Sequence, residues 1–190
     1  MKTITALILV LIMFSQICFG QNKKEKIINW DENRPLIWED FKGRASRGLP
    51  YDAQTYAGLS YELENLAKNE YKFKLNVNFD TKKSWVKRKE ATDKLLIHEQ
   101  SHFDIYEIYA RLLVKRLQES NPLSGQKFSD KVKKVFLKTY EELVKFGEKY
   151  DKETNHSKNE EKQKEWTEKI NKMLEDNKKH AKRELIFKVK

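Results

Sequence analysis

Cysteine is almost absent from this sequence of 190 residues, because the only one, Cys18, lies in the apolar segment near its N-terminus. Cleavage of that segment after Gly20 would leave a chain without cysteine, which cannot form a disulfide. Lipidation of Cys18 is disfavoured, since Ser15-Gln16-Ile17 lacks the leucine and the small residue of a lipoprotein signal. The fold must therefore be stable without disulfide bonds.

Hydrophobic runs long enough to span a membrane are missing as well. The N-terminal apolar run, Ile4 to Phe14, is too short for a comfortable span; it follows Lys2 and is followed by the small residue Gly20. These features predict a signal peptide over residues 1–20. They imply export to the periplasm or the extracellular space, without stable membrane insertion after cleavage. Residues 21–35 are predicted to be a polar lead-in and residues 36–190 a single domain.

Concentrated charge of one sign is also absent, although the formal net charge is +10. The lysines alternate with glutamates, most densely between Lys158 and Arg183. Interleaved charges of this kind are typical of solvated helix faces rather than of a nucleic-acid-binding stripe. Together with the predicted export, and without a matching sequence motif, this pattern argues against a nucleic-acid partner.

Glycine and proline do not occur in residues 91–117, where apolar residues recur with the period of an α-helix. The spacing predicts a long helix with one inward face. That face comprises Leu95, His98, Glu99, His102, Ile105, Tyr106, Tyr109, Leu113 and Leu117. The opposite, polar face comprises Gln100, Asp104, Glu107, Arg111, Lys115 and Gln118.

His98-Glu99-Gln100-Ser101-His102 is an HExxH motif within this predicted helix. Histidines four residues apart project from one face, one turn from each other, and can bind the same zinc ion. The glutamate beside the first histidine can then act as a general base. One buried histidine is common and needs only a hydrogen bond, but two histidines and a glutamate on an apolar face are costly to bury without a purpose. The motif therefore predicts a zinc site.

A catalytic zinc usually has three protein ligands and a water, so the third ligand must come from another part of the chain. The extended metalloprotease motif HExxHxxGxxH is excluded, because Ile105 and Ile108 stand where it requires glycine and histidine. His180 lies in the lysine-rich tail and is expected to be a solvated residue. The sequence therefore directs attention to the segments between residue 118 and this tail.

Four residues in those segments are candidates for the third ligand. His156 is favoured, because it lies in a polar break between two predicted helices, and such loops often carry site residues. Asp151, in the same break, is the runner-up, either as a ligand or as a side chain that orients one. Glu141 and Glu142 fit the pattern in which a glutamate from a following helix completes the site.

The rest of the sequence predicts an α+β fold, in which a small antiparallel sheet is followed by a long metal-binding helix and two further helices. Residues 71–79 alternate strictly between apolar and polar, as expected of a strand with one buried face. If this strand is a sheet edge beside the site, it could pair with an extended substrate. The other predicted elements are a strand at 55–63, helices at 130–149 and 158–179, and a short strand at 184–190. The apolar side of the helix at 130–149 comprises Val132, Val135, Phe136, Tyr140, Leu143, Val144 and Phe146.

Four sequence segments occur in an order that resembles a known bacterial family. They are WEDFKG at 38–43, AQT at 53–55, LIHEQSHFDI at 96–105 and YDKETNH at 150–156. The family consists of uncharacterised domains described as predicted secreted zinc-dependent proteases, and the resemblance spans about residues 36–166. It implies a zincin-like fold, His98, His102 and His156 as zinc ligands, and Glu99 as the catalytic residue. Ser157 stands where the family often has glycine, so the local turn is expected to differ.

The motif and the resemblance together predict a secreted or periplasmic zinc metallopeptidase that acts on a peptide or protein substrate. In this mechanism zinc activates a water, and Glu99 transfers its proton to the leaving amine. Tyr150 or Tyr106 could help to stabilise the oxyanion. The alternative is a non-catalytic envelope protein with a structural zinc, in which His156 and Asp151 would both be ligands and would close the site.

Overall fold

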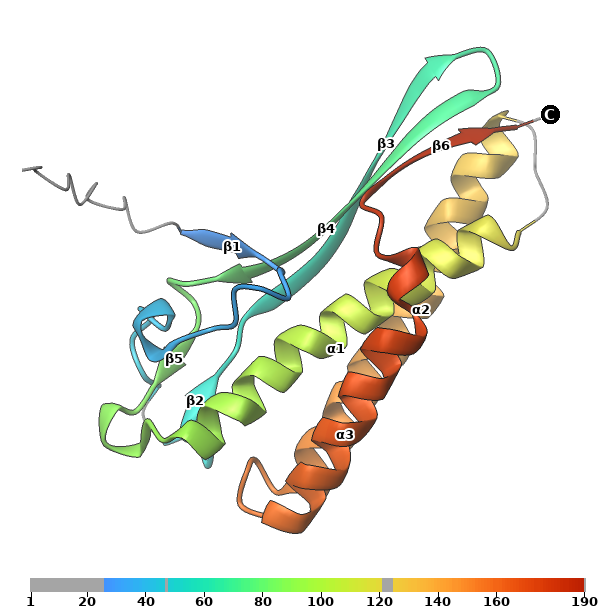
Figure 1. Cartoon of the computed structure of the whole chain (residues 1–190). Coiled ribbons are helices and arrows are strands. Elements are labelled where there is room, and N and C mark those ends of the chain that lie inside the picture. The colour runs from blue at the N-terminus through green and yellow to red at the C-terminus, as the bar shows by residue number, and fades with distance from the viewer. Residues whose placement is uncertain (1–25, 47, 121–124, 190) are drawn as a thin grey trace, which may run out of the picture.

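The computed structural model describes residues 26–46, 48–120 and 125–189 (Figure 1). The predicted signal peptide and the first residues of the predicted lead-in lie outside these ranges. The predicted α+β class is confirmed, and the described ranges contain an antiparallel sheet, three long helices and three short 3₁₀ helices (η). The elements are β1 (Ile27–Asn29), η1 (Trp38–Asp40), β2 (Ala53–Gln54), β3 (Ala57–Ala67), β4 (Glu70–Asp80), β5 (Trp85–Val86), η2 (Arg88–Glu90), α1 (Asp93–Gln118), α2 (Gly125–Thr154), α3 (Glu160–Asp176), η3 (Lys178–His180) and β6 (Glu184–Lys188).

β4 is the central strand of the larger sheet. Its buried side chains, Phe73, Leu75, Val77 and Phe79, alternate with partly exposed ones, as the sequence predicted. β3 pairs antiparallel with β4, and the turn between them contains Asn69 with a φ of 65°. β1 and β6 both pair with the other edge of β4, β1 opposite residues 78–80 and β6 opposite residues 70–74. A smaller sheet is formed by β2 and β5.

The strand at 71–79 is not a sheet edge, because β4 has neighbours on both sides, so the condition for its pairing with a substrate is not met. One of these neighbours, β1, lies within the predicted polar lead-in. Its three residues are too few to show a pattern, and only Ile28 is buried. Within the described residues, the long strand with a free edge is β3, which pairs only with β4.

α1 is the central helix, with the sheet on one side and α2 and α3 on the other (Figure 1). It begins after Thr92, whose side chain accepts a hydrogen bond from the Leu95 amide and caps the helix. The predicted inward face is confirmed for most of its length. The helix is buried more widely than predicted, however, because Glu107 and Arg111 of the predicted polar face are also buried.

A buried ion-pair network explains this difference. The Glu107 side chain has no exposed surface, and it pairs with Arg111, 2.7 Å away, and with Arg183. Arg111 also donates to the carbonyl oxygen of Leu174 and lies over the ring of Trp30. The buried carboxylate is thus paired with two guanidinium groups. The helical spacing could not reveal this, because Arg183 is 76 residues away from Glu107.

α2 is longer than predicted at both ends. The polar residues from Tyr150 to Thr154, predicted to be a break, continue the helix, because Tyr150 and Thr154 are fully buried in it. The chain leaves the helix only at residues 155–157, which all have positive φ values. Asp151 is therefore a helical residue in the last turn of α2.

The remaining predicted elements are confirmed with small shifts. α3 begins at a cap in which the Asn159 side chain accepts a hydrogen bond from the Lys162 amide, and the predicted last strand is β6.

The apolar side of α2 is covered only in part, since Tyr140 and Val144 are 36% and 40% exposed. In the described part of the chain, every helix is too short or too polar to span a bilayer.

Candidate metal centre

α1 presents His98, Glu99 and His102 to a pocket of about 170 Å³. His98 and Glu99 are 2% and 3% exposed, whereas the His102 side chain is 21% exposed. The other walls of the pocket come from residues 51–55, Leu95, Asp151 and His156. The shared face that the HExxH spacing predicted is thus confirmed, and it faces a concave site.

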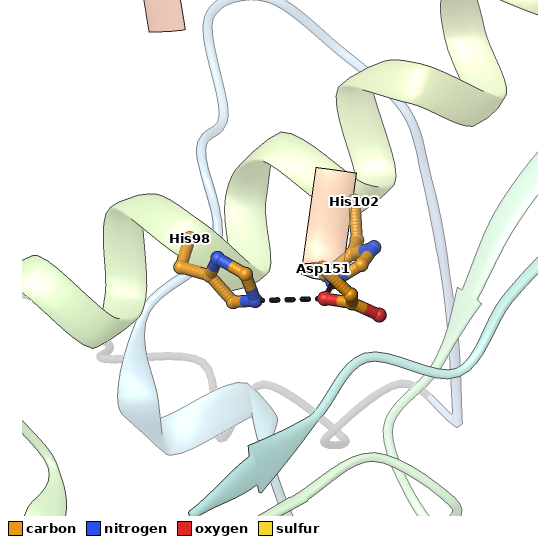
Figure 2. Close-up of side chains that lie close together, drawn as sticks. All are labelled: His98, His102 and Asp151. Atoms are coloured by element: carbon orange, nitrogen blue, oxygen red, sulfur yellow. Dashed lines mark hydrogen bonds and ion pairs between the residues drawn. The ribbon is translucent and has the colours of Figure 1, made fainter. Parts of the chain in front are cut away.

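Asp151 lies between the two histidines of α1 (Figure 2). Its Oδ1 atom is 2.9 Å from His102 Nε2 and 3.2 Å from His98 Nε2. α2 runs back beside α1, so that its last turn lies next to the first turns of α1 (Figure 1). The ligand atoms of the three residues all lie within 4.8 Å of one another, which is close enough for one metal ion to contact all three.

The charges in the cluster favour an ionised Asp151. Burial alone would raise the pKa of its carboxyl group, but hydrogen bonds and charges from His102 and His98 outweigh burial and hold that pKa far below its usual range. Burial also opposes a positive charge on His102, but the hydrogen bond and the negative charge of Asp151, with Glu99 nearby, raise the pKa of His102. A carboxylate in its ionised form is the form that binds metal ions.

α3 holds the far side of the His98 ring. Gln163 Oε1 lies 3.0 Å from His98 Nδ1, and the Gln163 amide group also bonds to the Tyr150 hydroxyl. The Tyr150 ring stacks on His98, with 4.7 Å between the ring centroids. If His98 is neutral and its one proton is on Nδ1, toward Gln163, then the lone pair of Nε2 faces Asp151 Oδ1, and two acceptors oppose each other. A cation or a second proton on the ring is needed to relieve this repulsion, and the donor set therefore fits a metal ion.

Glu99 adds a proton acceptor beside this cluster. Its Oε2 atom is buried and has no hydrogen-bond partner among the residues that the structure describes. A buried carboxylate oxygen without a partner costs folding free energy, so its retention at the pocket indicates a role in binding or chemistry. The backbone is fixed here as well, because Thr55 Oγ1 donates to the Glu99 carbonyl oxygen at 3.0 Å.

His156, the favoured third ligand in the sequence prediction, lies at the rim of the same pocket. Its side chain is 37% exposed, and its Nδ1 atom is 3.6 Å from Asp151 Oδ1. The ring packs against Tyr51, with 5.7 Å between the centroids. The structure thus brings the runner-up, Asp151, between His98 and His102, and it leaves His156 beside this group.

The other candidates lie away from the pocket or have a different role. Glu141 and Glu142 pair with Lys145 and Arg116, respectively, and neither glutamate lines the pocket. Tyr150 is fully buried behind the histidines, so it positions them rather than reaching a substrate.

His180 was expected to be solvated, but the whole residue is only 9% exposed. It lies next to the far end of α1, where its Nδ1 is 2.8 Å from Gln118 Oε1.

Gln163 is the site residue that the sequence reasoning missed. It lies in a helix dominated by lysine and glutamate, and glutamine has no charge that would draw attention to it. A signal was nevertheless present, because Gln163, Trp166 and Ile170 follow helical spacing and are the buried residues of α3. A polar residue on the buried face of a charged helix predicts a specific hydrogen-bond partner.

A protein-family model matches residues 46–157, which is more than half of the chain. The matched segment includes the pocket residues His98, Glu99, His102 and Asp151. The family is described as bacterial protein of unknown function (DUF922), so the match carries no statement about protease activity. Neither a curated protein nor a solved structure matches the chain. The membership predicted from the motifs is confirmed: the chain belongs to the DUF922 family of bacterial proteins of unknown function.

Proposed function

We propose that the protein is a zinc-dependent peptidase of zincin-like architecture, in which His98, His102 and Asp151 hold the metal ion. The observation that carries the proposal is the cluster of three ligand atoms in a pocket that also contains the unpartnered Oε2 of Glu99. Two imidazoles and one carboxylate form a ligand set known from catalytic zinc sites, which keep one coordination position open. The predicted signal peptide supports action after export, on peptides or proteins.

When bound in a site of this kind, zinc lowers the pKa of water and polarises a carbonyl oxygen. The side chains of the protein do the remaining work. Glu99 would accept a proton from the attacking water and deliver it to the amine of the leaving peptide. Gln163 orients His98 so that Nε2 faces the cluster, and Asp151 keeps a negative charge there.

One observation favours a structural zinc as the alternative. His156 Nδ1 lies 3.6 Å from Asp151 Oδ1, so a modest shift of its ring would add a fourth protein ligand. Four protein ligands would leave no open position for a water, and Glu99 would then have no chemical role. The two functions differ in what His156 does.

Variants of Asp151 and His156 test the proposal. We expect Asp151→Ala to lower the affinity for zinc by more than roughly 100-fold, because it removes a ligand, and His156→Ala to lower it by about tenfold at most. Zinc affinity is measured by competition with a chromophoric chelator, and hydrolysis with casein and a library of fluorogenic peptides. A protein that needs His156 for zinc, cleaves nothing and unfolds when chelated would instead have a structural site.

Replacement of Gln163 tests whether the support of His98 matters. We expect Gln163→Leu to lower zinc affinity by roughly 10- to 100-fold, because the imidazole loses the acceptor that fixes its proton on Nδ1. Gln163→Glu keeps an acceptor at this position and should recover most of the affinity. Lys164→Leu, at the exposed neighbouring position, is the matched control. Equal zinc affinities for Gln163→Leu and Lys164→Leu would contradict this role.

A further inference from the structure

Part of the apolar side of α2 has no cover in the described structure. Leu137, Tyr140 and Val144, named here the α2 stripe, are 57%, 36% and 40% exposed. Spacings of three and four residues place them on one face of the helix, and a further seven residues lead to Asp151 on the same face. The α2 stripe therefore runs in line with the proposed metal site.

Two more tyrosines from other elements join this surface. Tyr106 follows His102 by one turn of α1, and it forms a side-chain hydrogen bond with Tyr140. Tyr56 is 47% exposed and directly follows Thr55 in the pocket wall. Tyr56, which directly precedes β3, and side chains of α1 and α2 thus bring aromatic and apolar groups together beside the pocket.

Gly147 separates the α2 stripe from Asp151. A glycine inside a helix costs up to about 1 kcal/mol relative to alanine, so a packing reason is expected for it. No such reason is found among the described residues, because a Cβ atom at Gly147 would have no neighbour within 4 Å. The helix surface next to the site is therefore bare, and there is room for another chain to approach it.

The dimensions fit an extended peptide. From Leu137 to Asp151 the helix rises by about 21 Å, at 1.5 Å per residue, and an extended chain would cover that length with about six residues. β3, whose first residues adjoin Tyr56, offers unpaired backbone groups along its free edge in the described structure. Such an edge can hold an extended chain but gives it no side-chain preference.

We propose that the α2 stripe, together with Tyr56 and Tyr106, binds apolar and aromatic side chains of an extended polypeptide substrate on one side of the cleaved bond. The inference rests on the proposed function and adds a substrate class to it. An occupant of this kind would cover the exposed apolar surface and would enter the pocket at the level of Gly147 and Asp151.

The test uses two sets of fluorogenic peptides with six residues beyond the cleaved bond. In the apolar set, alternate positions carry leucine and phenylalanine; in the polar set, the same positions carry serine. We expect the wild-type protein to cleave the apolar peptides with a kcat/KM at least tenfold higher than that for the serine peptides. Leu137→Ser and Tyr140→Ser should reduce this preference. Gly147→Leu should raise KM at least tenfold, because it fills the bare helix surface, while kcat and zinc content stay within twofold.

Leu66→Ser is the matched control, since Leu66 is 45% exposed on β3 but lies at the opposite end of that strand from Tyr56. If the protein cleaves peptides and all α2 variants keep the wild-type preference and KM, this inference is overturned and the proposed function remains intact.

If the zinc-loaded protein cleaves nothing, the same peptides are labelled and their binding is measured by fluorescence anisotropy. Binding that weakens in Gly147→Leu would support the surface without the peptidase activity. If no peptide binds, and the wild-type protein self-associates while Gly147→Leu does not, the surface binds a second copy of the chain and the inference is overturned.

Discussion

Glu99→Gln is expected to slow peptide hydrolysis by a factor of roughly 10²–10⁴ and to leave the zinc content unchanged. The glutamine amide keeps the size of the side chain but cannot accept the proton of the attacking water. The three proposed ligands are not altered, and Glu99 is not one of them. Turnover is measured with the best fluorogenic peptide, and metal content by mass spectrometry on the same preparation.

The control for this variant is Glu119→Gln, which removes an exposed carboxylate at the other end of the same helix. It should keep full activity and full zinc content. Wild-type turnover in Glu99→Gln would show that another group accepts the proton. Loss of zinc in this variant would show that Glu99 acts as a ligand, and either result would refute the role given to it here.

Glu107→Ala is expected to lower the free energy of unfolding by roughly 3–5 kcal/mol. The carboxylate is fully buried, and its removal leaves the guanidinium groups of Arg111 and Arg183 without their counter-charge. Arg111 is itself buried, so water cannot replace the lost partner without opening the core. The free energy is measured by urea unfolding of the wild-type and variant proteins.

Glu141→Ala is the control for this second prediction, because Glu141 forms an exposed ion pair with Lys145 at the same helical spacing. Exposed pairs contribute little, so this variant should unfold close to the wild type. Replacement of the whole network by apolar residues, with Glu107→Leu, Arg111→Met and Arg183→Met combined, should recover most of the loss. A loss below about 1 kcal/mol in Glu107→Ala would contradict the buried-network account.

The sequence was most informative where one periodic pattern decided the structure. The strict alternation at 71–79 predicted β4, and the helical spacing from Leu95 to Leu117 predicted α1 with both histidines on its inward face. These patterns depend on neighbours within one element, and a single sequence records them directly. The same local spacing predicted that His98, Glu99 and His102 would share a face.

The rest depended on contacts between distant segments. Asp151 was placed in a loop because its neighbours are polar, but burial of Tyr150 and Thr154 keeps that segment helical and brings Asp151 to the histidines. Gln163 gained its meaning only from its contact with His98, 65 residues earlier in the chain. The burial of Glu107 likewise required Arg183. Local spacing carries no information about partners of this kind.

The two short strands on the outer edge of β4 have a consequence for how the chain folds. β4 can pair with β3 as soon as both are made, because a tight turn joins them, but β6 completes the opposite edge only after residues 184–188 emerge. Pairings between distant segments form slowly, and an incomplete strand edge readily joins other chains. The sheet is thus finished by the last element of the described chain. A variant without β6 should therefore aggregate during refolding even if its helices form.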